Sequence, residues 1–529
     1  MAGIFQMFRD SAAKKSGDVQ LPGRPGVTIP GDEFFNQFMI AGTTGRGKSQ
    51  ILLRILREIF GRINSGSNEI VIMTDSGGEF TRLFYDPKRV LLLSPGDNRT
   101  QDWAITKEFA RRTDFAMLAE ALVPETSDRN SEWTLYGRTL MRDALEIVFE
   151  WFSKDMLQGE DPYEALRRVL LEINMKEILR PLFRGTSSVG FVGDPKILTS
   201  VRTTVAPFLD ALQQIRPHGT FSVREWLRTC ISDPTYKQRI LILPYQDNQR
   251  AMYAALYATW LSLMTTELIS VGSDVKKRVW LICDELDSLG RISALQNALS
   301  QGRKHGLCFI GAIQSVSQLR KTYGENGADV LDTITPNKII LNPGGLTDAE
   351  FWSRAFGEHE MERAAVSRSP GKGTTGVTET LAPERRYSVA RLQELKKNQA
   401  IVRVDGVLYE YKASEILVQA TLAPAYVPAP EPPRREMPEY IAPWRDEDED
   451  GETPAKKPEK KQKGGARAKK PKAEEGGVKS VFEAFETAVN TEAQRIREHA
   501  HPDNEEPEAE PYDEEAEPFD EEADEGRHT

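Results

Sequence analysis

The sequence predicts an α/β fold with a largely parallel sheet, an inserted all-α domain and a disordered C-terminal tail. Seven short apolar runs resemble strands, and helical patterns separate most of them, as in a parallel sheet with crossover helices. One long interval between two of these runs holds only helical patterns, and the composition changes sharply after about residue 425. The strands are expected at 37–41, 70–74, 90–94, 239–244, 278–283, 307–313 and 338–342.

The first predicted strand leads into a glycine-rich loop that matches the phosphate-binding pattern G-x-x-x-x-G-K-[ST]. A helical pattern at 51–60 follows, so the loop joins a strand to a helix. Such a loop directs backbone N–H groups and the positive end of a helix at a polyphosphate. We expect Lys48 to reach the β- and γ-phosphates of ATP and the Ser49 hydroxyl to hold Mg²⁺. The predicted cofactor-binding residues are Gly42, Thr43, Thr44, Gly45, Arg46, Gly47, Lys48 and Ser49.

The strand predicted at 278–283 ends in two acids, Asp284 and Glu285. In P-loop NTPases a carboxylate at such a strand end holds Mg²⁺, and a second one can polarise the attacking water. We therefore assign Asp284, with Ser49, to the metal and Glu285 to general-base catalysis. The alternative is a core strand followed by a solvated acidic turn. The presence of a P-loop in the same chain makes this alternative less favoured. Because a base is present, the pattern favours hydrolysis over nucleotide binding alone.

The interval between about 105 and 217 shows no strand pattern, and we predict an all-α domain at 105–217. The nucleotide-binding domain is then split into a first part, 26–104, and a second part, 218–425. The uncharged run at 251–266 contains polar residues and stops at an acid, so it predicts a buried core helix rather than a membrane span. Two groups of apolar residues fall on single helical faces: Leu140, Met141, Ala144, Leu145, Val148 and Phe152, and Leu166, Val169, Leu170 and Ile173.

The two ends of the chain are expected to lack a folded core. Residues 1–25 are interpreted as a flexible segment without the apolar region of a signal peptide. Residues 426–529 are interpreted as disordered because their composition buries too little apolar surface. This tail contains a basic run at 456–472 and an acidic terminus at 503–525. Solubility alone is the alternative explanation for both charged runs.

The net charge of −11 belongs to this tail rather than to the folded part. From residue 503 to the last residue there are fourteen acids and one Arg, a net charge of −13, so the remaining chain carries +2 (−11 minus −13). The overall acidity therefore does not exclude a nucleic-acid partner. The three cysteines form no C-x-x-C pair, which argues against a disulfide framework and a zinc site and fits a reducing cytoplasm.

Several segments taken together resemble conjugative type IV coupling proteins of the TraD/TrwB family. The resemblance extends from about residue 35 to residue 415, and apart from the P-loop no single segment is specific. The segments that carry it are 38–49, 74–80, 221–227, 283–289, 302–306, 313–315, 318–319 and 323–324.

This resemblance implies a RecA-like P-loop NTPase core that carries the all-α insert and assembles as a homo-hexamer around DNA. It also implies a DNA-dependent ATPase that recruits the relaxosome and helps pump single-stranded plasmid DNA, with its relaxase, into a type IV secretion channel. Single- and double-stranded DNA, the relaxase and channel proteins are then partners. The acidic tail would capture a relaxosome accessory protein.

The resemblance also assigns two further catalytic residues. Gln314, which follows the strand at 307–313, corresponds to a polar sensor near the γ-phosphate. Arg303 corresponds to an arginine that reaches the nucleotide of a neighbouring subunit. A solvated surface charge is the alternative for Arg303, and Ser315 could take the sensor position.

Family members are expected at the cytoplasmic face of the bacterial inner membrane, usually with transmembrane helices before the motor. Only about 35 residues precede the P-loop strand here. We therefore expect that the anchor is absent from this chain or supplied by another protein, and that the chain is mostly monomeric without it.

Two other functions remain open. The first is another motor, either a chromosome translocase of the FtsK or HerA kind or an ATPase that secretes protein. The helical insert and the 302–306 segment favour the coupling protein. The second is a relaxosome adaptor that does not hydrolyse ATP. The intact set of Lys48, Ser49, Asp284 and Glu285 argues against it.

Overall fold

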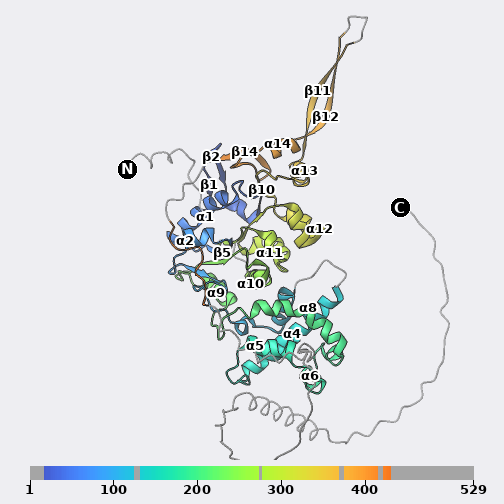
Figure 1. Cartoon of the computed structure of the whole chain (residues 1–529). Coiled ribbons are helices and arrows are strands. Elements are labelled where there is room, and N and C mark those ends of the chain that lie inside the picture. The colour runs from blue at the N-terminus through green and yellow to red at the C-terminus, as the bar shows by residue number, and fades with distance from the viewer. Residues whose placement is uncertain (1–16, 124–130, 273–276, 369–374, 415–420, 431–529) are drawn as a thin grey trace, which may run out of the picture. The chain divides into compact units, whose positions relative to one another are not determined.

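The structure is a computed structural model that describes residues 17–123, 131–272, 277–368, 375–414 and 421–430 of the 529 (Figure 1). The predictions for residues 1–16 and for the tail from 431 onward, including its basic run and acidic terminus, lie outside these ranges.

A ten-stranded mixed sheet forms the core of the described chain. Seven neighbouring strands, from β10 to β6, are parallel, and three further strands extend the sheet antiparallel at one edge. All seven predicted strands are confirmed, whereas the three antiparallel ones were not predicted. In spatial order the strands are β2 (Gly23–Arg24), β14 (Val407–Ala413), β13 (Gln399–Val404), β10 (Asn337–Ile340), β4 (Phe38–Ala41), β9 (Leu307–Ile313), β8 (Val279–Cys283), β5 (Ile70–Ser76), β7 (Ile240–Tyr245) and β6 (Val90–Leu92).

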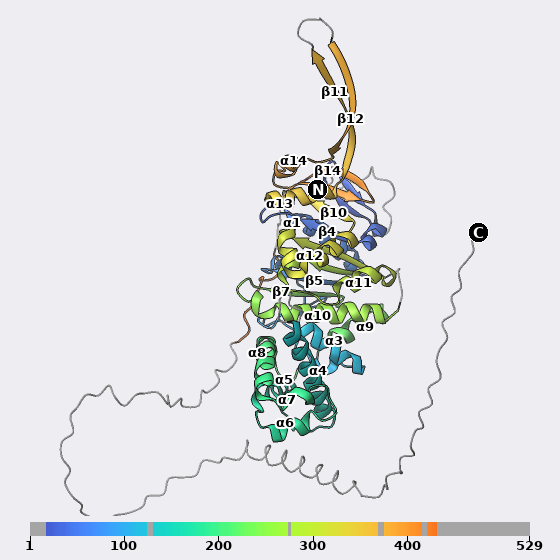
Figure 2. The ribbon, with the colours of Figure 1, turned by 90° about the vertical axis from the view of Figure 1, so that its right-hand side faces the viewer.

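Helices cover both faces of this sheet, which explains why its central strands are continuously apolar. Successive strand residues point to opposite faces. Thus Val71 and Met73 pack with α1 (Lys48–Asn64), and Ile70 and Ile72 belong to the opposite cluster. That cluster includes α10 (Arg250–Ser270), α11 (Leu295–Gly302) and α12 (Val316–Ile334) (Figures 1 and 2). The predicted buried core helix is therefore confirmed as α10. Two short helices, α13 (Leu346–Ala355) and α14 (Val389–Gln393), follow α12.

Between β6 and β7 the described residues form helices, turns and loops, apart from isolated bridges at Leu92–Thr100, Asp97–Pro428 and Trp103–Phe221. The all-α character of the insert is therefore confirmed, while its boundaries at 105 and 217 stay a prediction. The helices are α3 (Arg112–Leu122), α4 (Ser131–Ser153), α5 (Pro162–Arg167), α6 (Lys176–Leu182), α7 (Val189–Val192), α8 (Pro195–Leu212) and α9 (Val223–Ser232).

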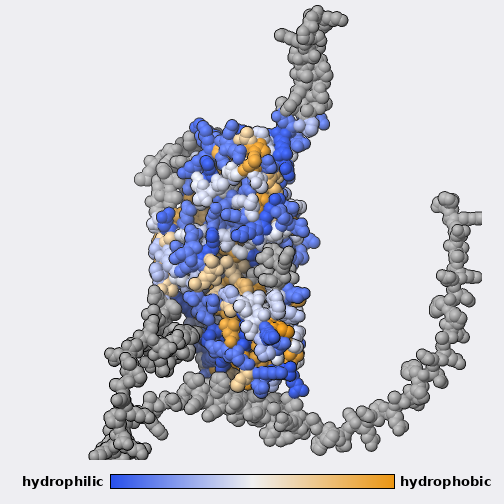
Figure 3. All heavy atoms as spheres, turned by 45° about the vertical axis from the view of Figure 1, so that its right-hand side comes forward, coloured by the Kyte–Doolittle hydropathy of each residue, from blue (hydrophilic) through white to orange (hydrophobic). Residues whose placement is uncertain are grey.

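The predicted apolar faces of the insert are buried with one clear exception. On α4 the predicted face is buried from Leu140 to its member Val148, but Phe152, one residue before the helix ends, is 47% exposed. The second face is interrupted, because α5 passes into a π-turn at Arg168–Glu172 and Ile173 follows it. Most of the surface in Figure 3 is hydrophilic, with apolar patches over part of the insert.

Both ends of the described chain are more ordered than predicted. The flexible segment expected through residue 25 is wrong from residue 17, because β1 (Val19–Leu21) pairs with β3 (Val27–Ile29) and its Val19 and Leu21 are buried. At the other end, residues 421–430 form hydrogen bonds with the core beyond the expected limit of 425. The strand β11 (Glu358–Arg368) was not predicted, because acids rather than apolar residues alternate along its first half. This strand forms a separate two-stranded sheet with β12 (Thr375–Arg385).

No helix within the described ranges has both the length and the apolar character needed to cross a membrane.

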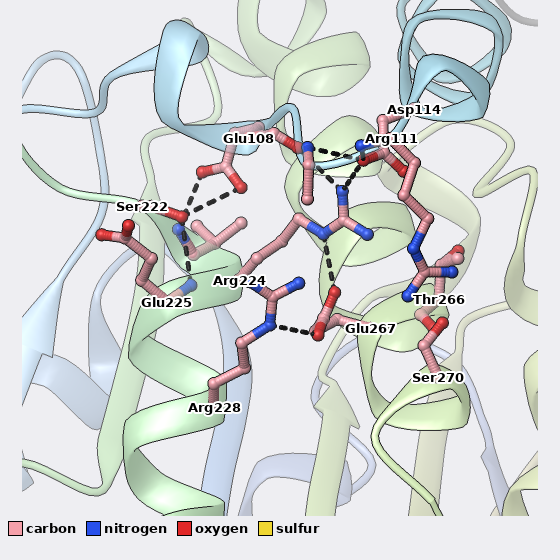
Figure 4. A network of polar contacts seen from close by, with 12 residues as sticks. Glu108, Arg111, Asp114, Ser222, Arg224, Glu225, Arg228, Thr266, Glu267 and Ser270 are labelled. Carbon is pink, nitrogen blue, oxygen red and sulfur yellow. Dashed lines mark hydrogen bonds and ion pairs between the residues drawn. The ribbon is translucent and has the colours of Figure 1, made fainter.

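The insert joins the core through a buried network of charges (Figure 4). Arg224 on α9 is 2% exposed; it contacts Asp114 of α3 at 2.8 Å and Glu267 of α10 at 2.7 Å. It also donates to the main-chain oxygen of Glu108, and Arg228 contacts the second carboxylate oxygen of Glu267. Because Arg224, Asp114 and Glu267 are removed from water, each of these charges depends on its partners. The network therefore fixes how α3, α9 and α10 meet.

Glu108 gives this junction a pH dependence that can be measured. Its carboxylate accepts hydrogen bonds from Trp103 Nε1, the Ser222 hydroxyl and the Val223 N–H, and burial raises its pKa to about 7. The folded state therefore holds this proton more tightly than the unfolded chain. The contribution of Glu108 to the free energy of unfolding falls as the pH rises from about 4.5 to 7, by on the order of 2–3 kcal/mol.

Glu108→Gln should remove this pH dependence, because the amide is uncharged and can keep the contacts with Trp103 and Ser222. Urea unfolding followed by circular dichroism at pH 5 and pH 7.5 measures the change. Glu225→Gln, at an exposed acid of the same junction, is the control and should leave the difference between the two pH values as in the parent chain. An unchanged difference in Glu108→Gln would contradict the prediction.

Candidate active site

The parallel strands bring four polar segments to one edge of the sheet. β4, β9, β8 and β5 are consecutive neighbours, so their carboxyl ends lie side by side. The P-loop follows β4, Gln314 follows β9, Asp284 follows β8, and Ser76 ends β5. Because β9 lies between β4 and β8, Gln314 lies between the P-loop and the acidic pair.

The P-loop adopts the strand–loop–helix arrangement that its sequence predicts. Gly47 caps α1 with a φ of +114°, and the Cβ of any other residue would lie 2.4 Å from Asn398 Oδ1. Thr44 and Gly45 are exposed, so this part of the loop is open to solvent. The Lys48 ammonium donates a hydrogen bond to the Gly42 carbonyl. Its amine therefore already lies inside the loop.

The charges around Lys48 place it in the same site as the acids. Burial lowers its pKa, and this effect is opposed by the negative charges of Glu285, Asp287 and Asp284. The predicted convergence of the P-loop amine with the two carboxylates at 284 and 285 is thus present in the structure.

A chain of hydrogen bonds connects the P-loop to the candidate base. The Thr44 hydroxyl donates to Gln314 Oε1 at 3.2 Å, and Gln314 Nε2 donates to Glu285 Oε1. The other carboxylate oxygen, Glu285 Oε2, accepts from the Ser76 hydroxyl at 3.4 Å. Both oxygens of Glu285 are therefore held, and one of them is held by the residue predicted as the sensor.

Asp284 lies in an environment that suits a cation. Its Oδ2 accepts from the Ser76 N–H at 2.8 Å, and its Oδ1 accepts from the Thr74 hydroxyl at 3.3 Å. Burial, reinforced by the charges of Asp75 and Glu285, raises the pKa of Asp284 well above its ordinary value. A bound cation would offset this repulsion.

The donor set fits Mg²⁺ held together with a nucleotide. Mg²⁺ prefers oxygen ligands and usually takes only one or two from the protein, the rest coming from phosphates and water. Asp284 and the Ser49 hydroxyl in the first turn of α1 offer oxygens of this kind. Within the described ranges no group of three or more His, Cys, Asp or Glu side chains forms a metal site by itself, so a site shared with phosphate oxygens fits better.

Sequence reasoning gave no role to several residues around this site. Asp75 is fully buried and accepts from the Phe80 and Thr81 N–H groups, which fixes the start of α2 (Glu79–Phe84). Burial raises its pKa to about 6, and burial likewise raises the pKa of Asp287 to about 6. The sequence could have pointed to both residues, because Asp75 and Asp287 follow the ends of two predicted strands.

Arg303 does not lie at the site of its own chain. It is exposed in the turn Arg303–His305, which precedes the amino end of β9, whereas Gln314 follows the carboxyl end. A strand of seven residues separates the two positions by about 20 Å. The other predicted residues converge, and Arg303 could serve only a different copy of the chain.

A family model described as the type IV secretion-system coupling protein DNA-binding domain matches residues 24–409. Among individual relatives, the coupling protein TraD of Escherichia coli (strain K12) is 28% identical over 428 residues, which cover 78% of this chain and 57% of TraD. The VirD4 coupling protein of Bartonella henselae is 25% identical over 157 residues, 29% of this chain and 25% of VirD4. The chain thus spans just over half the length of TraD.

Solved structures of the conjugative coupling protein TrwB have a similar fold. Its unbound form, lacking an N-terminal segment, superposes with a TM-score of 0.66 at 26% identity, covering 78% of this chain and 92% of that one. TrwB in complex with ADP and Mg²⁺ gives a TM-score of 0.65 at 26% identity, covering 80% and 94%. The predicted RecA-like NTPase fold is confirmed by this similarity.

Proposed function

Because the chain belongs to the family of type IV secretion-system coupling proteins, we propose that it is a DNA-dependent ATPase of bacterial conjugation. In this role it recruits the relaxosome and helps pump single-stranded plasmid DNA into a type IV secretion channel. The observation that carries the proposal is the meeting of Lys48, Asp284 and Glu285 at one edge of the sheet.

The proposed reaction assigns one task to each side chain. Lys48 leaves the Gly42 carbonyl and binds the β- and γ-phosphates, and Ser49 and Asp284 would hold Mg²⁺. Bound Mg²⁺ would supply positive charge to the phosphate oxygens. Glu285 accepts a proton from the attacking water as the water oxygen bonds to the γ-phosphorus and the bond to the bridging oxygen breaks, releasing ADP.

The hydrogen-bond chain gives this reaction a way to depend on the nucleotide. Thr44 belongs to the loop that would surround the phosphates, and its hydroxyl contacts Gln314, which in turn holds Glu285. A γ-phosphate that engages Thr44 would change the partner of the Gln314 amide and thereby the position of the base. Gln314 is therefore proposed as the sensor.

The partners follow from the family. We propose that single- and double-stranded DNA bind through phosphate contacts, which makes the affinity strongly salt-dependent. The relaxase, a relaxosome accessory protein bound by the acidic tail, and the channel proteins are the proposed protein partners. The active assembly is proposed to be a homo-hexamer at the cytoplasmic face of the inner membrane.

The test is the rate of ATP hydrolysis by the full chain with no DNA, with single-stranded DNA and with double-stranded DNA. We expect single-stranded DNA to raise the rate and added salt to reduce this stimulation. Lys48→Ala should abolish both the basal and the stimulated rate because the β- and γ-phosphates lose their charge partner. Lys88→Ala, at an exposed lysine outside the site, is the matched control.

The two alternative functions give different results in the same assay. A chain that binds a nucleotide analogue but never hydrolyses ATP would be an adaptor. A chain that hydrolyses ATP at a rate independent of DNA would fit a protein-secretion ATPase. Stimulation by double-stranded DNA alone would fit a motor of the FtsK or HerA kind.

A further inference from the structure

Residues 421–430, here called the strap, lie against the nucleotide-binding core. The Leu422 N–H donates to the Arg82 carbonyl at the end of α2, at 2.9 Å. Further along, the Val427 carbonyl accepts from the Asn98 N–H at 2.7 Å, and the Ala429 N–H donates to the Gly96 carbonyl at 2.8 Å. The strap is thus hydrogen-bonded to the core along most of its length.

The surface that the strap contacts, here called the seat, is completed by an ion pair between buried Asp97 and half-buried Arg99. Asp97 is fully buried; it accepts from the Val427 N–H at 3.2 Å and from Arg99 at 2.6 and 2.9 Å. Arg99 in turn donates to the main-chain oxygens of Pro424 at 2.9 Å and Ala425 at 3.3 Å. Hydrogen bonds to charged groups in such places contribute more than neutral ones. Both charged side chains of the seat therefore form hydrogen bonds with the main chain of the strap.

The seat lies on the same edge of the sheet as the candidate active site. Its parts follow the carboxyl ends of β5, β6 and β7. After β7, the side-chain amide of Gln249 donates a hydrogen bond to the Tyr426 hydroxyl at 3.2 Å. The P-loop, Gln314 and Asp284 follow the carboxyl ends of β4, β9 and β8. Because β5 neighbours β8, its end belongs to both sets.

Gly78 is the point where the strap meets this shared strand end. The Ala425 carbonyl oxygen lies 2.7 Å from the position of a Cβ at residue 78, so only glycine fits beneath the strap. Gly77 has the same φ of +72°, but a Cβ there would meet nothing within 4 Å. Gly78 stands two residues after Ser76, whose N–H and hydroxyl hold Asp284 and Glu285. Asp75 fixes the other side of this turn through Phe80 and Thr81.

We propose that the strap is a positioning element of the hydrolytic site: by fixing the turn 76–79 it holds Ser76, and through Ser76 both carboxylates. The inference rests on the proposed ATP hydrolysis, and it adds a regulatory route. The strap continues in the sequence into residues 431–529, so a partner that binds the tail acts on the segment that supports the base. The acidic residues at 503–525 would attract a partner with a basic surface.

Two truncated chains, 1–430 and 1–420, test the proposal because they differ only by the strap. We expect kcat for ATP to be about 10- to 100-fold lower in 1–420, the size typical of losing a group that orients a catalytic ligand. The KM for ATP should change little, because the P-loop lies on β4, away from the strap. Hydrogen exchange of the peptide covering residues 76–81 should be faster in 1–420.

Equal exchange at 76–81 in the two chains would overturn the proposal, whatever the activity. So would an equal kcat, even if 1–420 unfolded at a lower temperature, because the strap would then be only a structural clamp. If 1–430 hydrolysed no ATP, the proposed function would fail. The exchange comparison would still decide whether the strap holds the turn.

Gly78→Ala and Gly77→Ala form a matched pair in which the backbone strain is the same and only the contact with the strap differs. With the strap present, Gly78→Ala should lower kcat at least several-fold more than Gly77→Ala and should release the strap to faster hydrogen exchange. In the 1–420 chain the two variants should be equal. Equal effects in both chain lengths would overturn the proposal.

Discussion

The Glu285→Gln variant is expected to bind ATP and Mg²⁺ but to hydrolyse ATP about 10²- to 10⁴-fold more slowly, the usual contribution of a positioned base. The amide keeps the shape of the carboxylate, so it can still accept from Gln314 Nε2 and can donate to the Ser76 hydroxyl. Only the ability to take a proton from water is lost. Single-turnover hydrolysis and equilibrium binding of a non-hydrolysable analogue measure the two properties separately.

The charge of Glu285 has a second effect that the experiment must separate. Among the neighbouring charges it is the largest that opposes the lowering of the Lys48 pKa by burial, so Glu285→Gln lowers that pKa further. Loss of the Lys48 proton would weaken analogue binding and would be reversed at lower pH. Loss of the base would not be reversed at lower pH. Full hydrolysis by Glu285→Gln would transfer the base role to another group, such as Asp287, whose charge interacts with both Glu285 and Lys48.

Much of this site could be predicted because its residues belong to short segments with their own chemical signature. The P-loop is contiguous, and the acid pair directly follows an apolar strand. Their meeting also followed from the sequence, because parallel strands end at the same edge. Gln314 was placed by resemblance, and the strand order gives its physical reason, since β9 lies between β4 and β8.

The parts that could not be predicted depend on contacts between distant segments. Ser76 contacts the two carboxylates only because β5 pairs with β8, and no pattern around residue 76 predicts that pairing. The predicted limit at 425 divided the strap, and its residues from 426 onward were assigned to the disordered tail. In the structure the strap's N–H donors to the core belong to non-proline residues: Leu422, Ala423, Val427 and Ala429. Val19 and Leu21 were missed because three residues are too few for a periodic pattern.

The Arg303→Ala variant is expected to bind ATP normally and to lose DNA-stimulated turnover by about 10³-fold or more, the effect typical of an arginine supplied to a phosphoryl group by a neighbouring subunit. Arg303 is exposed at the amino end of β9, whereas its own P-loop follows the carboxyl end of the neighbouring strand β4. It therefore has no route to the nucleotide of its own chain. Lys304→Ala is the matched control, since this exposed charge stands on the same turn.

Mixing two inactive variants separates action between subunits from a structural defect. In Arg303→Ala the base is intact, and in Glu285→Gln the arginine is intact. A site whose base comes from the first variant and whose arginine comes from the second is complete. If the two assort at random around a ring, about one quarter of the sites are complete, and turnover should recover to about that fraction of the parent rate. No recovery, with assembly on DNA shown by light scattering, would mean that Arg303 does not act across the interface.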